Sequence, residues 1–271
     1  MPKDLRGGYP TFWREFGAGP REALMIHCSL SHSGAWTALA GELSDKLHMT
    51  AFDIPGHGKS EDWDHRGEYQ AVTTAMAADF PTGPVDVMGH SFGATVALRL
   101  AIEQPHLVRS LTLIEPVFFA VAYDDVPGLR ERQNIMQQPQ IEAVARGDMV
   151  AATRAFNALW GDDDMPWDSL PKQMRINMIK RFGAILSAGP AVEDDVGGML
   201  RPGRIEGVSV PTLLLEGANS PEVLGLVNKG LARRLLQSRR EILPECGHML
   251  PITHPAEVGA LIRRFLDEVP V

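Results

Sequence analysis

The strongest candidate for a reactive group in this sequence is Ser91, which lies in the segment Gly89-His90-Ser91-Phe92-Gly93. A Gly-x-Ser-x-Gly segment often occurs by chance, so its meaning depends on its surroundings. The apolar run 85–89 predicts a strand that leads into the segment, and 92–104 predicts a helix that leads out of it. Such a strand-to-helix turn raises the serine hydroxyl above the sheet, where it can attack a carbonyl carbon.

A serine hydroxyl is a weak nucleophile, so it needs a base, and that base needs an acid to orient it. His248 follows the last predicted strand, at the sheet edge where parallel sheets bind ligands. The order of serine before histidine along the chain fits one known arrangement of such residues. His90 and His57 lie in tight glycine-containing turns, and we expect them to have structural roles.

Alternating apolar runs and helical patterns must position these groups. Before residue 117 the pattern predicts strands at 23–28, 49–53, 85–89 and 110–115, and helices at 37–47, 69–80 and 92–104. After residue 207 it predicts strands at 209–215 and 240–243, and helices at 221–236 and 255–268. Near-continuous apolar strands separated by helices predict a parallel sheet that is buried on both faces.

The segment 117–207 has no convincing strand pattern. It predicts small helices at 140–145, 148–160 and 169–186, with Asp148 at the N-cap of the second. It contains six of the twelve methionines together with Trp160 and Trp167. These side chains fill an irregular core, form the apolar wall of a pocket, or do both. The sequence therefore predicts a core domain of 1–116 and 208–271, with a helical cap at 117–207.

Composition excludes several classes of partner. Lys and Arg number 26 against 34 Asp and Glu, so the net charge of −8 disfavours binding to nucleic acid or to an anionic membrane. No apolar run reaches the roughly 18 residues that a membrane span needs, and the N-terminus lacks the pattern of a signal peptide. The two cysteines are too few to form a disulfide framework. We expect a cytoplasmic protein with a small-molecule substrate and no metal; the oligomeric state stays open.

Taken together, the motifs resemble the α/β-hydrolases, in the branch of cap-bearing esterases, lactonases and C–C hydrolases. The segments that carry the resemblance are His27 with 33–36 (SGAW), 53–60 (DIPGHGKS), 89–93 (GHSFG), 113–116 (LIEP), 210–217 (VPTLLLEG) and 246–248 (CGH). They cover essentially all of the chain except the cap. The resemblance implies an α/β fold with a mostly parallel, doubly wound sheet, and a cap inserted after the strand that ends at Glu115. It also implies that no cofactor is needed.

The resemblance further implies an oxyanion hole, formed by the backbone N–H groups of Ser29 and Phe92. Each such donor typically contributes about 10²–10³ in turnover. The family usually has His-Gly after its first parallel strand, whereas this chain has His27-Cys28. The Cys28 side chain therefore occupies a place where there is usually none, and we expect it to narrow or redirect that loop.

A second departure concerns the acid. The family's acid usually lies three residues after the glycine of the 210–217 segment, which gives Ser220, a residue that cannot ionise. Some members place the acid at the end of the preceding parallel strand, where this chain has Glu115. Glu222 is another candidate, and a working Ser-His dyad is a further alternative. We expect Glu115 to orient His248.

These observations predict a cofactor-free serine hydrolase that cleaves a small ester, lactone or related carbonyl substrate through an acyl-enzyme. Ser91, His248 and Glu115 are its expected catalytic residues, and Trp160 and Trp167 are expected to line the substrate pocket. Because Ser220 replaces the usual acid, the alternative is a ligand-binding or signalling protein with little turnover.

Overall fold

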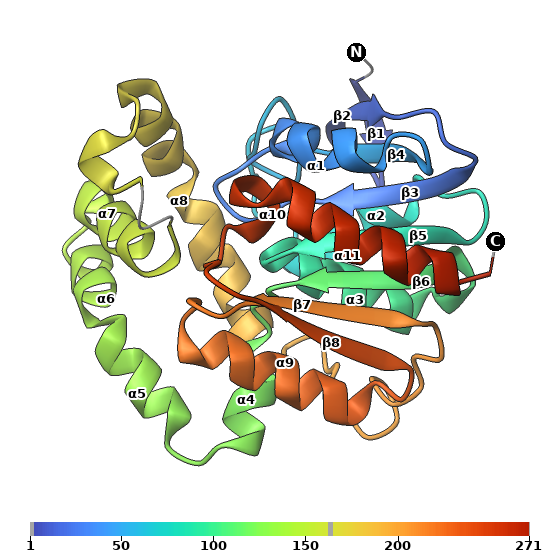
Figure 1. The fold of residues 1–271 in the computed structure, drawn as a ribbon. Helices are drawn as coiled ribbons and strands as arrows, with labels where there is room; N and C mark the ends of the chain where they lie inside the picture. Colours follow the sequence, from blue (N-terminus) through green and yellow to red (C-terminus); the bar gives the residue numbers. More distant parts are fainter. Residues whose placement is uncertain (1–2, 162–164, 271) are drawn as a thin grey trace.

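A computed structural model describes residues 3–161 and 165–270 (Figure 1). In that part of the chain, eight strands form one sheet in the order β1-β2-β4-β3-β5-β6-β7-β8. The strands are β1 (Lys3–Arg6), β2 (Tyr9–Phe16), β3 (Arg21–Ile26), β4 (Leu47–Phe52), β5 (Val85–His90), β6 (Val108–Ile114), β7 (Thr212–Gly217) and β8 (Ser238–Leu243). β1 pairs antiparallel with β2, and β2 with β4; all other neighbours are parallel. The mostly parallel, doubly wound α/β fold is confirmed.

The helices alternate with the parallel strands, except for one group between β6 and β7. Those of the sheet region are α1 (Thr37–Leu43), α2 (Tyr69–Ala78), α3 (Phe92–Glu103), α9 (Glu222–Arg234), α10 (Leu250–Thr253) and α11 (Pro255–Glu268). Those between β6 and β7 are α4 (Phe119–Asp125), α5 (Leu129–Met136), α6 (Gln138–Ala145), α7 (Met149–Trp160) and α8 (Lys172–Glu193). None of the described helices is long and apolar enough to cross a membrane.

Each face of the sheet has its own apolar core, because successive side chains of a strand point to opposite faces. On β3, Leu24 and Ile26 join one core with side chains of α2, α3 and α9. Met25 joins the other core with side chains of α1 and α11. Burial on both faces accounts for the near-continuous apolar runs in the sequence.

The helices α5 to α7 lie beyond one end of the sheet, and α8 leads back toward it (Figure 1). Phe182 on α8 packs with Ala143 on α6 and Ala152 on α7. The Asp148 side chain accepts a hydrogen bond from the Ala151 N–H at 2.9 Å, which confirms the predicted N-cap of α7. The side chains of α7 and α8 line cavities together with Ser29, which follows β3. This group of helices therefore covers the carboxyl ends of the strands, where ligands bind parallel sheets.

The structure differs from the sequence-based prediction at several boundaries and in elements that were not predicted, among them helices α4 and α5. The predicted helix 37–47 ends at Leu43, because Leu47 already pairs in β4. The predicted helix 169–186 begins after Pro171 and continues through Pro190 to Glu193. β1 and β2 were not predicted. β1 is largely exposed and β2 contains Pro10, so neither strand has the continuous apolar run that indicates a buried strand.

Candidate active site

Ser91 lies in the sharp turn between β5 and α3, with a φ of 56° and a ψ of −120°. This conformation is strained for a residue with a side chain, and such strain is typical of functional sites. The glycines on either side make the turn possible by close packing. A Cβ on Gly89 would lie 2.3 Å from the Gly93 carbonyl oxygen, and one on Gly93 would lie 2.1 Å from the Ile26 carbonyl oxygen. The sequence segment therefore forms the predicted turn.

Two hydrogen bonds join Ser91, His248 and Glu115 into one chain. His248 Nε2 lies 3.0 Å from Ser91 Oγ, and His248 Nδ1 lies 3.2 Å from Glu115 Oε2. All three side chains are buried, and Glu115 is completely so. With the proton on Nδ1, His248 donates to Glu115 and accepts from the Ser91 hydroxyl, which is the arrangement that general-base activation of a serine requires.

Glu115 is held in place through its second oxygen. The Gly217 N–H donates to Glu115 Oε1 at 2.6 Å, and the Ser220 hydroxyl donates to the same atom at 2.9 Å. Glu222, the other candidate acid, is exposed in the first turn of α9. A carboxylate there complements the positive end of the helix dipole. Of the candidate acids considered from the sequence, the structure brings Glu115 to His248.

The two histidines with expected structural roles hold the loops that carry the site. His90 Nε2 lies 2.8 Å from the His248 carbonyl oxygen, to which it donates. His57 Nε2 accepts a hydrogen bond from the Leu30 N–H at 2.9 Å, and its Nδ1 donates to the Pro55 carbonyl. Burial lowers the pKa of His57 to about 3, so the ring stays neutral and keeps an acceptor nitrogen. Sequence reasoning did not identify these partners.

Ser29 and Phe92 both line the cavity that contains Ser91. Within residues 3–161 and 165–270, neither backbone N–H donates to a protein acceptor. The Ser29 loop is constrained, because the next residue, Leu30, has a φ of 62° and is anchored by His57. In acyl-transfer enzymes, N–H groups beside the reacting serine stabilise a developing oxyanion, so these two groups are candidates for that role.

The Ser91 cavity has a volume of about 360 Å³ and lies between the sheet and α5 to α8. Trp160 lines it, with its ring centroid 5.8 Å from that of His248. A second cavity of about 460 Å³ shares Ser29, Phe156 and Trp160 with the first. Cavities of this size accommodate small organic molecules. The site therefore offers space on two sides of the Ser29 loop.

Trp167 does not occupy its expected place. It lines neither cavity and packs instead against Leu30, Leu170 and Met178 in a small apolar cluster. The expectation that Trp167 lines the substrate pocket is wrong, because its side chain packs in this cluster against α8 instead.

Cys28 is buried and lines the second cavity. Burial raises the pKa of its thiol to about 12, so the thiolate needed for nucleophilic chemistry is scarce near neutral pH. Both Cys28 and Cys246 are free thiols. Over the described parts of the chain, no cluster of three or more His, Cys, Asp or Glu side chains is placed to hold a metal ion.

Comparison with known proteins places this geometry in a family. Residues 23–261 match the model of the alpha/beta hydrolase family. The chain belongs to the alpha/beta hydrolase family. It is 31% identical to lipase LipV of Mycobacterium tuberculosis over 263 residues, which is 91% of this chain and 93% of the lipase. It is 28% identical to the pimeloyl-[acyl-carrier protein] methyl ester esterase of Nitrosomonas europaea, over 89% of this chain and 93% of that enzyme.

Solved structures of this family share the fold. The enol-lactonase of Burkholderia xenovorans has a TM-score of 0.75 at 17% identity, covering 98% of this chain and 100% of that one. A thermophilic esterase of Thermogutta terrifontis has a TM-score of 0.71 at 21% identity, covering 97% of this chain and 95% of that one. This hydrolase therefore has relatives with esterase and lipase names and shares its fold with a lactonase.

Proposed function

We propose that this protein is a cofactor-free serine hydrolase that cleaves a small ester, lactone or related carbonyl substrate. The observation that carries the proposal is the hydrogen-bonded chain from Ser91 Oγ through His248 to Glu115, beside a cavity of about 360 Å³. The relatives named as a lipase and as methyl ester esterases support an ester substrate class.

In the proposed mechanism His248 removes the hydroxyl proton as Ser91 attacks the substrate carbonyl carbon. The oxyanion that develops accepts hydrogen bonds from the N–H groups of Ser29 and Phe92. His248 then gives the proton to the departing alcohol, and an acyl-enzyme remains on Ser91. Water, activated by His248, hydrolyses this ester and restores the serine. Glu115 stabilises the imidazolium that forms in both steps.

We further propose that residues 117–207 act as a cap that selects the substrate. Trp160 and Phe156 line both cavities from this segment, so the cap supplies walls on either side of the reacting carbonyl. Apolar groups bound there gain about 0.8 kcal/mol for each buried CH₂.

Fluorophosphonate labelling combined with turnover of a panel of p-nitrophenyl esters, lactones and thioesters tests the proposal. We expect stoichiometric labelling of Ser91 and many turnovers per enzyme for at least one ester. Labelling with no multiple turnover would instead support a ligand-binding protein on a hydrolase fold. Absence of labelling would contradict the proposed nucleophile.

A further inference from the structure

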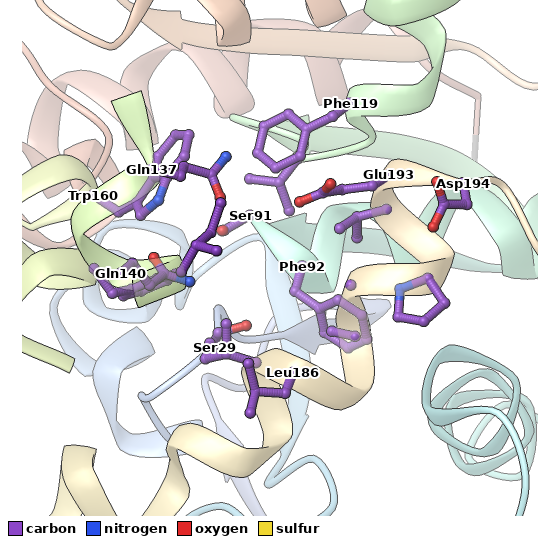
Figure 2. Close-up of a pocket in the computed structure, with 18 of the residues that line it drawn as sticks. Ser29, Ser91, Phe92, Phe119, Gln137, Gln140, Trp160, Leu186, Glu193 and Asp194 are labelled. Atoms are coloured by element: carbon purple, nitrogen blue, oxygen red, sulfur yellow. The ribbon is translucent and has the colours of Figure 1, made fainter. Parts of the chain in front are cut away.

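The Ser91 cavity contains a carboxylate that the proposed mechanism does not use. Glu193 is the last residue of α8 and lines the cavity. Figure 2 shows its carboxylate pointing from α8 into the cavity, beside Phe119 and toward Ser91. Among the described residues, no donor or cation lies within hydrogen-bonding or ion-pairing distance of this carboxylate. The Glu193 carboxylate therefore has no direct partner within the described substrate space, and the nearby Arg130 charge only partly offsets the cost of its burial.

The neighbouring cation is already engaged. The Arg130 guanidinium forms an ion pair with Asp194 Oδ1 at 2.7 Å, donates to the Glu193 main-chain carbonyl, and stacks over the Tyr123 ring at 4.7 Å. Arg130 thereby neutralises Asp194, the other carboxylate at this end of the cavity. The Tyr123 hydroxyl is buried without a partner in the described structure, so it does not satisfy Glu193 either.

The position of Glu193 is unfavourable for the folded protein. Burial raises the pKa of its carboxyl, because charge is costly away from water. Glu193 also lies at the C-terminal end of a helix, where the helix dipole disfavours a negative charge. Neither helix stability nor internal pairing accounts for a glutamate here. A residue whose charge and position are unfavourable for the fold is often found at a functional site.

The aromatic walls of this cavity fit a cation. Phe119, Phe156 and Trp160 line the same cavity, and the centroids of Phe119 and Trp160 are 5.5 Å apart. Aromatic faces attract cations, and quaternary ammonium groups are commonly bound by several aromatic rings. Figure 2 shows Phe119 beside Glu193, and Trp160 across the cavity together with the neutral amides of Gln137 and Gln140. No lysine or arginine occurs among the described residues that line it.

We propose that Glu193 is a specificity residue that binds an ammonium group of the substrate. The enzyme then prefers esters that carry a fixed positive charge over neutral esters of the same shape. This inference rests on the proposed function, because it concerns the substrate of the same site.

Two pairs of isosteric esters test the inference, since the positive charge can lie on either side of the ester bond. Butyrylcholine is paired with 3,3-dimethylbutyl butyrate, and ethyl 4-(trimethylammonio)butanoate with ethyl 5,5-dimethylhexanoate. We expect the wild type to prefer the charged member of at least one pair by about 10-fold or more in kcat/KM. In Glu193→Gln the preference falls about 10-fold, mainly through KM.

Glu142→Gln is the matched control, because it removes the same charge from an exposed cap residue outside the cavity. We expect Glu142→Gln to keep the wild-type preference for the charged ester. Equal kcat/KM within both pairs, or a preference that persists in Glu193→Gln, would overturn the inference.

A binding measurement separates this inference from the proposed function. If the wild type turns over none of the four esters faster than Ser91→Ala, the hydrolase proposal fails for these substrates. Calorimetric binding of the four esters to Ser91→Ala still tests Glu193. We expect tighter binding of a charged ester, which is lost in Ser91→Ala/Glu193→Gln. Equal binding of charged and neutral esters contradicts the inference whatever the turnover.

Discussion

The Ser220 hydroxyl donates a hydrogen bond to Glu115, with 2.9 Å between Ser220 Oγ and Glu115 Oε1. Ser220 stands where the family usually has its acid, so in this chain that position supports the carboxylate of a neighbouring strand. The Gly217 N–H donates to the same oxygen, which leaves Glu115 Oε2 facing His248. The two positions form one unit, in which the Glu115 carboxyl group faces His248 and the Ser220 hydroxyl holds it in that orientation.

Replacement of the acid tests this relationship. We expect Glu115→Gln to lower kcat by at least about 10²-fold, because an amide cannot stabilise the imidazolium; the comparable change in a well-studied triad costs about 10⁴-fold. Glu222→Gln, the matched control at an exposed position in the first turn of α9, should change kcat by less than about twofold. Steady-state kinetics on one ester decides, and the reverse ranking would move the acid to Glu222.

Removal of the supporting hydroxyl should have a smaller effect. Ser220→Ala leaves the Gly217 N–H on Glu115 Oε1, so the carboxylate keeps one of its two fixed donors. We expect kcat to fall by less than about tenfold, or about 1.4 kcal/mol, because the Gly217 N–H still holds Glu115 and its other oxygen still faces His248. A loss as large as that of Glu115→Gln would mean that Ser220 has a more direct role.

The rate should depend on neutral His248. A protonated imidazole cannot accept the Ser91 proton, so kcat/KM is expected to decline as the solution becomes acidic. His248→Ala should lose most of the activity, and its residual rate should lack this acid limb. If His248→Ala retained both the wild-type rate and its decline in acid, another residue would be the base.

Stability should decrease in acid because of buried neutral histidines. Burial lowers the pKa of His57 from 6.5 to about 3, so between these values the unfolded chain binds a proton that the folded chain excludes. The stabilising contribution is present above pH 6.5 and is lost as the pH falls, at up to about 1.4 kcal/mol per pH unit.

Urea unfolding of His57→Gln at a series of pH values measures this contribution. The variant should show a shallower decline of unfolding free energy between pH 6.5 and 4 than the wild type. His106→Gln, which changes an exposed histidine, serves as the control and should match the wild-type slope. Identical slopes for the wild type and His57→Gln would contradict the prediction.

Local patterns in the sequence were sufficient to predict most of the fold. The buried run 85–90 and the glycines around Ser91 predicted the strand and its turn, because each rests on neighbours along the chain. The strand pair β1 and β2 escaped prediction, since its stability depends on pairing rather than on an apolar run. The extension of α8 to Glu193 was missed because Pro190 usually ends a helix.

The candidate site was only partly predictable from the sequence, because some of its contacts join residues that are far apart along the chain. Ser91 and His248 lie in distinctive segments, whereas the pairing of Glu115 with Ser220 joins residues 105 positions apart. Trp160 and Trp167 have the same side chain and lie in the same segment, yet only Trp160 lines the cavities. The role proposed for Glu193 could not be predicted from the sequence, because it depends on the position of its carboxylate in the cavity without a direct partner among the described residues.

A comparison of the wild type with Ser91→Ala tests whether Ser91 is the nucleophile. Ser91 sits on a turn and contributes little to packing, so the variant should keep the wild-type melting temperature. We predict that the wild type turns over at least one neutral ester many times, and that Ser91→Ala lowers kcat by about 10³-fold or more. A correctly folded Ser91→Ala protein that retained most of the wild-type kcat would show that Ser91 is not the nucleophile.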